Sequence, residues 1–218
     1  YAYKHLFQKA FRKQRNGVLV VLDNKREYTG IKAQATSPRQ LNSMLYGSDR
    51  PPKVVRAIPS QPVEAVAEEY LRAAWGPDND LSGPDMNYRP RFGVRFFIED
   101  MPTFYDSPYK TPYYLRYWTT TGRAFERTII GCSQRAQLIP KTFLTMVDHI
   151  FVFSMSDYDV DKFLVPIHGY RVAQAVKSLP EYGYVLVSDL YKEPISFPPV
   201  KGPATKSKKG IIIPVEYG

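Results

Sequence analysis

The most informative run of the chain is Val18-Leu19-Val20-Val21-Leu22, which ends at Asp23. All five residues before the acid are apolar, so both faces of a strand formed here would be buried. Strands buried on both faces belong to parallel sheets that carry helices on either side, whereas half-exposed strands alternate apolar and polar residues. The run therefore predicts a central strand of a parallel sheet, with a carboxylate at its C-terminal end.

Short apolar strands alternate with helical segments along the rest of the chain. Strands are expected at residues 53–58, 93–98, 127–130 and 150–153, with a closing hairpin at 184–187 and 194–197. Helices are expected at 2–15, 41–45, 63–75, 109–121, 140–146, 157–164 and 170–179. Thr36-Ser37-Pro38 supplies a cap and a first-turn proline for the second helix. This alternation specifies a three-layer α/β fold with a mainly parallel central sheet. We expect one domain over residues 1–200 and a basic tail over residues 201–218.

The composition favours a globular protein with an anionic partner. A length of 218 residues suits one large domain, since domains average roughly 150 residues. Hydrophobic residues make up 44% and charged residues 23%, which excludes a wholly disordered or collagen-like chain. The 30 lysines and arginines exceed the 21 aspartates and glutamates by 9. A net charge of +9 favours an anionic partner, and nucleic acid is the first candidate.

The rarer residues exclude several classes of protein. Cys132 is the only cysteine, so no disulfide forms within the chain. The three histidines are too far apart in the sequence to suggest a zinc site. No apolar run approaches the roughly 18–20 residues of a membrane span, and the first residues lack a signal-peptide core. We therefore expect a protein that works inside a cell, or inside a particle assembled there.

Polar residues follow three of the expected strands. They are Asp23 with Lys25 and Glu27, then Glu99-Asp100, then Ser133-Gln134-Arg135. In open α/β sheets the functional groups gather at the carboxyl ends of the strands. An apolar strand followed by two acids is the Walker B arrangement of nucleotide hydrolases. One acid holds Mg²⁺ through its water shell, and the next orients the attacking water. Acids that merely terminate a strand give the same local pattern, so this match alone does not decide the function.

The order of several motifs along the chain is more specific. They are Val20-Val21-Leu22-Asp23-Asn24-Lys25-Arg26-Glu27-Tyr28, 96–100, Thr121-Gly122-Arg123, 128–135, 138–141, 150–153, 157–164 and 181–187. The ordered set, over about residues 1–200, resembles the FtsK/HerA superfamily of P-loop DNA motors. The chain is compact and lacks an added helicase or pore domain. Within the superfamily it is therefore most similar to the genome-packaging ATPases of membrane-containing icosahedral viruses. The resemblance implies a P-loop NTPase fold of the RecA/ASCE type.

The resemblance also implies ATP and Mg²⁺ as ligands and assigns roles to single residues. Glu99 takes the position that holds Mg²⁺ through water, and Asp100 takes that of the base that activates the attacking water. The family usually has Asp followed by Glu, so the shorter base must lie closer to the water here. Gln134 is expected to sense the γ-phosphate. The remaining cofactor-binding residues are Asp23, Glu27 and Arg135.

Arg123 resembles the arginine finger of the family, which reaches the ATP of a neighbouring subunit and stabilises transferred charge. Arg135 is the runner-up for this role, and the alternative for Arg123 is a solvated arginine after the helix-ending Gly122.

The partners implied by the resemblance are double-stranded DNA and further copies of the chain in a ring, a hexamer or a pentamer. Capsid vertex or membrane proteins are further candidates, and the implied location is the virion or the host cytoplasm. The implied activity is ATP-driven DNA translocation for viral genome packaging. Two other functions stay open: a non-catalytic nucleic-acid-binding or capsid-associated protein with a P-loop-like fold, and a HerA-type cellular DNA pump.

One expected motif is missing, because residues 1–218 contain no phosphate cradle of the form Gly-x-x-x-x-Gly-Lys-Ser/Thr. Such a P-loop binds phosphates with the backbone N–H groups at the N-terminus of a helix. In the family this helix runs directly into the second strand, and a basic amphipathic helix is expected at 2–15, before the strand at 18–22. We therefore expect the first strand and the cradle to lie just before Tyr1.

Two further segments have two interpretations each. Aromatic and basic residues at 104–117 serve core and loop packing, or they contact the bases or phosphate backbone of a nucleic acid. The lysines of 201–209 form a solvated tail, or they contact DNA or a capsid.

Overall fold

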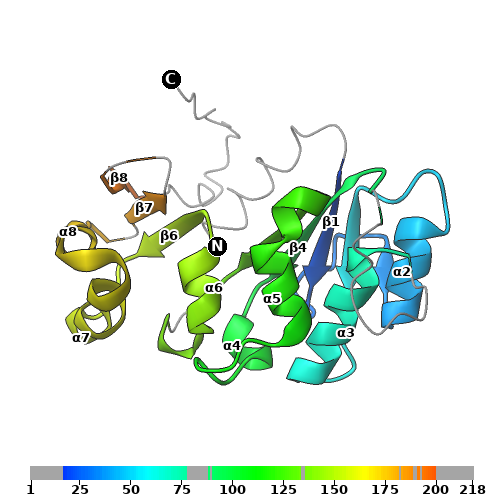
Figure 1. Ribbon diagram of the computed structural model, residues 1–218, viewed down its shortest axis with the longest axis horizontal. Helices are drawn as coiled ribbons and strands as arrows, with labels where there is room; N and C mark the ends of the chain where they lie inside the picture. Colours follow the sequence, from blue (N-terminus) through cyan, green and yellow to red (C-terminus); the bar gives the residue numbers. More distant parts are fainter. Residues whose placement is uncertain are drawn as a thin grey trace, which may run out of the picture.

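The computed structural model describes residues 17–77, 88, 90–133, 136–181, 183–188, 191 and 193–199. Its central feature is a sheet of five strands in the order β2-β3-β1-β4-β5 (Figure 1). The strands are β1 (Gly17–Leu22), β2 (Gln34–Ala35), β3 (Val54–Ala57), β4 (Gly93–Ile98) and β5 (Arg127–Gly131). Each neighbouring pair is parallel. The strand at Val18–Leu22 lies in the middle, so the predicted parallel α/β fold is confirmed.

Helices pack against one face of this sheet. They are α2 (Pro38–Tyr46), α3 (Glu64–Trp75), α4 (Met101–Phe104), α5 (Tyr113–Thr120) and α6 (Lys141–Met146), with short 3-10 helices η1 (Gly122–Phe125) and η2 (Ala136–Leu138). Alternate residues of the central strands, such as Val20 and Phe96, meet the apolar side chains of these helices in one core. In Figure 1, α3 and α5 lie in front of the sheet. The helix expected at residues 2–15 lies outside the described part of the chain.

Two helix starts follow from capping and proline chemistry. The Ser37 hydroxyl accepts a hydrogen bond from the Gln40 N–H at 3.2 Å, and Pro38 opens α2, as predicted. The helix expected from residue 109 begins only at Tyr113. Pro112 precedes it in an extended conformation, with ψ at 159°. Pro108 and Pro112 both disfavour helical conformation in the residue before them, so residues 105–112 form a loop.

The C-terminal strands form a second sheet in the order β6-β7-β8, which is antiparallel throughout. The strands are β6 (His149–Phe153), β7 (Tyr184–Ser188) and β8 (Ile195–Phe197), and the helices beside them are α7 (Asp157–Asp159), the π-helix η3 (Val160–Leu164) and α8 (Val165–Lys177). The predicted closing hairpin is confirmed by β7 and β8. The strand at 150–153 was expected to join the alternating α/β sheet. It pairs instead along its whole length with β7, which runs antiparallel to it.

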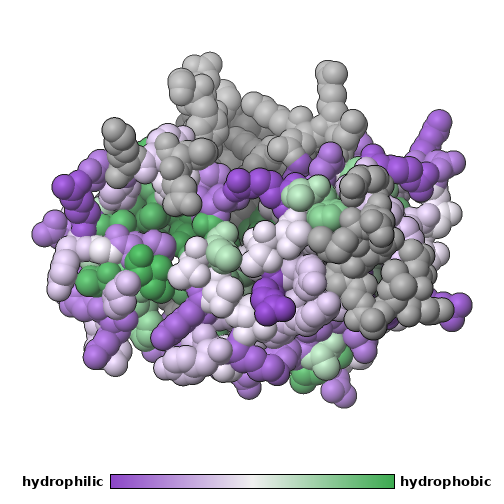
Figure 2. Space-filling model, viewed as in Figure 1, coloured by the Kyte–Doolittle hydropathy of each residue, from purple (hydrophilic) through white to green (hydrophobic). Residues whose placement is uncertain are grey.

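The two faces of the second sheet differ. One face packs on η3 and α8 through a small core that includes Val152, Val172 and Val185. The other carries aromatic rings, with Tyr184 stacked on Phe197 at a centroid distance of 4.8 Å. Figure 2 shows hydrophobic side chains gathered over the region of β6, β7 and α8. The second sheet therefore has its own core, separate from that of the five-stranded sheet.

Candidate functional site

The ends of three parallel strands meet at one edge of the central sheet. Leu22 pairs with Ile98, and Ile98 pairs with Gly131, so the residues that follow these strands are neighbours. The Cys132 N–H donates to the carbonyl oxygen of Ile98 at 2.9 Å. This arrangement places Asp23 and Glu99-Asp100 at the same edge, as expected, and Cys132 lies there too. Gln134 and Arg135, also expected here, lie outside the described residues.

Asp23 is completely buried beneath this edge, with 0% of its surface exposed. Its Oδ1 accepts a hydrogen bond from the Glu27 N–H at 3.0 Å, and its Oδ2 accepts one from the Tyr28 N–H at 3.0 Å. The same Oδ2 accepts a 2.7 Å hydrogen bond from Nε of the buried Arg56. Asp23 therefore shapes the loop at 24–28, and direct contact of this carboxylate with a cofactor stays a prediction.

The loop at 24–28 brings Lys25 over the acids of the edge. Its Nζ lies 3.0 Å from Oδ2 of Asp100, and both side chains are partly exposed. The hydrogen bond to Asp100 raises the pKa of Lys25 although burial opposes it, and the charges of Asp100, Glu99 and Glu27 add to the rise. Arg26 holds a left-handed conformation with φ at 58°, which costs a non-glycine residue energy. The buried anchors of Asp23 hold this strained turn in place.

Glu99 and Asp100 differ in their access to solvent. Glu99 is buried, with 7% of its surface exposed, whereas the Asp100 side chain is 25% exposed. Burial first, and then the charges of Glu99 and Asp100, raise the pKa of the Cys132 thiol to about 12. The two carboxylates therefore give this edge a negative charge around Cys132. Both acids offer the oxygen ligands that Mg²⁺ prefers.

A metal bound here would take few ligands from the protein. Among the residues that the structure describes, no three His, Cys, Asp or Glu side chains form a cluster that could hold an ion. Mg²⁺ usually keeps several waters and is bound through one or two carboxylates together with substrate phosphates. The pair Glu99-Asp100 fits that binding mode and does not fit a cage made by protein side chains alone.

Arg123 lies at the opposite edge of the sheet. It belongs to η1, which precedes β5, whereas Glu99 follows β4, and the two strands are parallel. A strand of five residues spans about 16 Å at roughly 3.3 Å per residue, so the length of β5 separates the two positions. The Arg123 side chain is 83% exposed and pairs with Asp148. Within one subunit the structure therefore does not bring Arg123 to Glu99.

Two residues of this region were not anticipated from the sequence. Arg56 neutralises Asp23, and its signal was a charged residue inside the otherwise apolar run Val54-Val55-Arg56-Ala57. Glu68 is a half-buried acid of α3 that binds the start of α5. Nothing in the local pattern around Glu68 distinguishes it from an exposed helix acid.

None of the described helices is both long and apolar enough to span a membrane.

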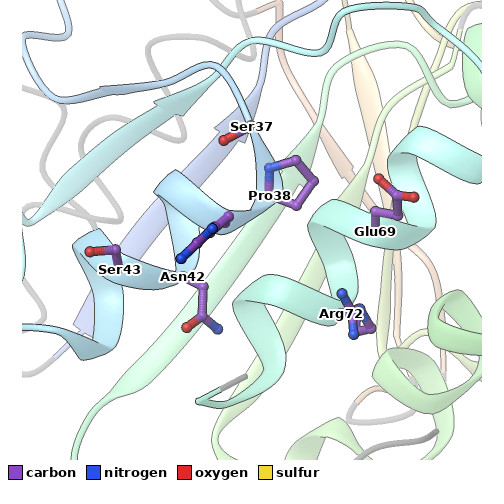
Figure 3. A pocket seen from close by; sticks show the side chains of 7 residues that line it. Ser37, Pro38, Asn42, Ser43, Glu69 and Arg72 are labelled. Carbon is purple, nitrogen blue, oxygen red and sulfur yellow. The ribbon is translucent and has the colours of Figure 1, made fainter. Parts of the chain in front are cut away.

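A groove of about 650 Å³ lies between α2 and α3, away from the acids at the strand ends (Figure 3). The Asn42 amide joins the two helices by donating to the carbonyl oxygens of Ala73 at 2.9 Å and Gly76 at 2.7 Å. The groove is lined by Ser37, Pro38, Arg39, Asn42, Ser43, Glu69 and Arg72. It contains none of the predicted site residues and is a separate surface.

Comparison with known proteins identifies the fold. No protein-family model and no curated protein matches the chain. Genome packaging NTPase B204 from Sulfolobus turreted icosahedral virus 2, in complex with ATP-gammaS, matches with a TM-score of 0.73 and 14% identity, over 91% of this chain and 90% of that one. Its complex with AMPPCP gives 0.71 and 15% over the same shares. B204, the DNA-packaging ATPase from Sulfolobus Turreted Icosahedral Virus, gives 0.67 and 12%, again over 91% and 90%. At these identities the likeness shows a shared fold.

The buried pair of Asp23 and Arg56 predicts a large loss of stability for Arg56→Met. Removing one partner of a buried ion pair leaves the other charge uncompensated and costs about 3–5 kcal/mol. The matched control is Arg91→Met, because Arg91 also pairs with an acid, Asp49, but in the solvent. Exposed pairs contribute about 0–1 kcal/mol. Urea unfolding followed by circular dichroism measures both. Equal losses in the two variants would contradict the structural role of Arg56.

The negative charge around Cys132 predicts that removing the Glu99 charge changes the reactivity of this thiol. Glu99→Gln removes one of the charges that raise the pKa of this thiol, so the pKa falls below about 12. Below both pKa values, each unit of decrease gives about tenfold more thiolate. The rate of alkylation by iodoacetamide between pH 8 and 9.5 therefore rises, and Cys132 is the only cysteine that can react. Glu193→Gln, in an exposed pair with Arg171, is the control. Equal rates in the two variants would show that Glu99 does not act on the thiol.

Proposed function

We propose that this chain is the motor domain of an ATP-driven translocase that packages double-stranded DNA into a viral particle. The observation that carries the proposal is the pair Glu99-Asp100 at the carboxyl end of a central parallel strand, beside the loop held by Asp23. This is the edge at which α/β sheets bind ligands. The fold shared with genome packaging NTPase B204 over nine-tenths of both chains supports the same function.

Each acid of the edge has a task that suits its exposure. Glu99 is the more buried, and we propose that it holds Mg²⁺ through water beside the phosphates of ATP. Bound Mg²⁺ would neutralise phosphate charge. Asp100 reaches the solvent, and we propose that it orients the attacking water and accepts its proton. Lys25 holds the Asp100 carboxylate in position at 3.0 Å. Gln134 is the proposed γ-phosphate sensor, with Glu27 and Arg135 as further binding residues.

A phosphate cradle is the part of the site that residues 1–218 do not supply. Among the described residues, β5 pairs only with β4, and β6 pairs only with β7. In the described part of the chain, each of these strands therefore has one side with no neighbouring strand, where a further strand can form backbone hydrogen bonds. We propose that the strand carrying the cradle pairs at the free edge of β5. Reading the codons upstream of Tyr1 tests whether the cradle exists, since a Gly-Lys-Ser/Thr loop should then lie within about ten residues.

The position of Arg123 supports a ring of subunits. An arginine at the edge opposite to Glu99 cannot complete the site of its own subunit across the length of β5. In a closed ring, Arg123 can instead reach the acidic edge of a neighbouring subunit. We therefore propose a homo-oligomeric ring, hexameric or pentameric, around duplex DNA. The proposed setting is the packaging vertex of a virion or the host cytoplasm, with capsid or membrane proteins as further partners.

The second candidate function is a non-catalytic nucleic-acid-binding or capsid-associated protein with the same fold. The observation in its favour is the lack of a phosphate cradle within residues 1–218. A cellular DNA pump of the HerA type differs from a packaging motor in its setting and shares the same site. ATP hydrolysis by the full-length protein separates the motor from the binding protein.

For the full-length protein, we expect Asp100→Asn to lower kcat for ATP by about 10²–10⁴-fold, the range for loss of a general base. The KM for ATP should change little, because Asp100 contacts the water and not the nucleotide. Asp161→Asn is the matched control, since Asp161 is an exposed acid paired with a lysine. Phosphate release under steady-state conditions measures both parameters. A kcat equal to that of the control would remove Asp100 from the mechanism.

Arg123→Ala tests the ring and the chemistry together. We expect it to leave the ATP affinity of a subunit intact and to lower DNA-stimulated turnover by about 10³–10⁵-fold, as for other arginine fingers. Mixing this variant with Glu99→Ala should restore partial turnover, since some interfaces then combine an intact Glu99 with an intact Arg123. Arg171→Ala, in an exposed pair with Glu193, is the control. A mixture that stays inactive would reassign the finger to Arg135 or remove it.

A further inference from the structure

The loop at 105–112 begins one short helix after the acidic edge. It joins α4, which starts directly after Asp100, to α5. One carboxylate ties its two ends together. Glu68 Oε1 accepts hydrogen bonds from the Tyr105 hydroxyl at 3.3 Å and the Leu115 N–H at 3.1 Å, while Oε2 accepts one from the Tyr114 N–H at 2.6 Å. The loop is therefore closed at its base.

The middle of this loop is fixed against α6. The Lys141 N–H donates to the carbonyl oxygen of Pro108 at 2.9 Å. Its Nζ lies 4.8 Å from the centre of the Tyr109 ring, within the range of a cation–π contact. The Tyr109 side chain is nevertheless 83% exposed. The Tyr109 ring is thus exposed on a loop that is held at both ends and in its middle. Such a ring is a preorganised contact surface rather than part of the core.

Two exposed lysines lie next to this tyrosine, since Lys110 follows it in the chain and Lys141 contacts its ring. The tyrosine–lysine tip consists of Tyr109, Lys110, Tyr113, Arg116 and Lys141, all of them exposed. The carboxylates near Lys110 are Glu64, whose Oε1 lies 2.7 Å from Lys110 Nζ, together with Asp106 and Glu68. The hydrogen bond to Glu64 raises the pKa of Lys110, so its amine stays charged. The pair between Lys110 and Glu64 is solvent-exposed, and such pairs are weak enough for a phosphate to replace the carboxylate.

We propose that the tyrosine–lysine tip binds the phosphate backbone of duplex DNA, with Lys110 and Lys141 each neutralising a phosphate. This inference rests on the proposed function for the choice of DNA as the partner. Three exposed cations among exposed aromatic rings are the pattern of nucleic-acid surfaces. The tip is separated from Asp100 by α4 and half of one loop, so the acidic edge and the DNA surface belong to one continuous segment.

The test is the salt dependence of DNA binding, which needs no nucleotide. The full-length protein is titrated onto a fluorescein-labelled 30-bp duplex at 50–200 mM KCl, and anisotropy gives the binding constant. The tip variant is Lys110→Met/Lys141→Met. The matched control is Lys162→Met/Lys177→Met, which removes two exposed lysines elsewhere and lowers the net charge of +9 by the same two units. Lys177, like Lys110, pairs with an acid in the solvent.

We expect the tip variant to reduce the slope of log K against log salt by about 1.8, because each phosphate contact contributes about 0.9. Its affinity at 50 mM KCl should fall on the order of 10²-fold. The control should retain the slope of the wild type. Equal slopes in the tip variant and the control, with tight binding by the wild type, would overturn the proposal for the tip alone. No binding of duplex by the wild type would overturn both the tip and DNA as the partner.

Discussion

The buried ion pair between Asp23 and Arg56 is the contact on which the acidic edge depends. Asp23 ends the central strand, and Arg56 compensates its charge from the neighbouring strand. The same carboxylate collects the N–H groups of Glu27 and Tyr28 and so holds the turn in which Arg26 is strained. Without these bonds the loop at 24–28 would have no fixed path, and Lys25 would not be held against Asp100.

A second carboxylate, that of Glu68, holds the loop at 105–112 in the same way. Glu68, like Asp23, accepts two backbone N–H groups and one side-chain donor. Burial raises the pKa of Glu68, and the hydrogen bonds that it accepts oppose the rise. The loop fixed by Asp23 lies over the acids, and the loop fixed by Glu68 carries the tyrosine–lysine tip. Two anchored loops thus place the proposed nucleotide edge and the proposed DNA surface at the two ends of α4.

The parallel sheet was predictable because a run such as Val18–Leu22 is apolar at every position, and the shared edge followed from the parallel strands. Pairing across the chain was not. Nothing local shows that Arg56 neutralises Asp23, or that β6 pairs antiparallel with β7 in a second sheet. The start of α5 at Tyr113 follows from Pro112, which disfavours a helical conformation in the residue before it. The roles of the predicted site residues stay predictions, and Gln134, Arg135 and the helix at 2–15 lie outside the described residues.

In the proposed function, ATP hydrolysis at the acidic edge moves the chain along duplex DNA. Displacement of a labelled third strand from a triplex at the far end of a long duplex measures this movement directly. We expect the full-length protein to release the third strand with Mg-ATP and to leave it bound with AMPPCP. Tight DNA binding with no release in Mg-ATP, at protein concentrations that saturate the duplex, would contradict a translocase and favour a non-catalytic DNA-binding protein with this fold.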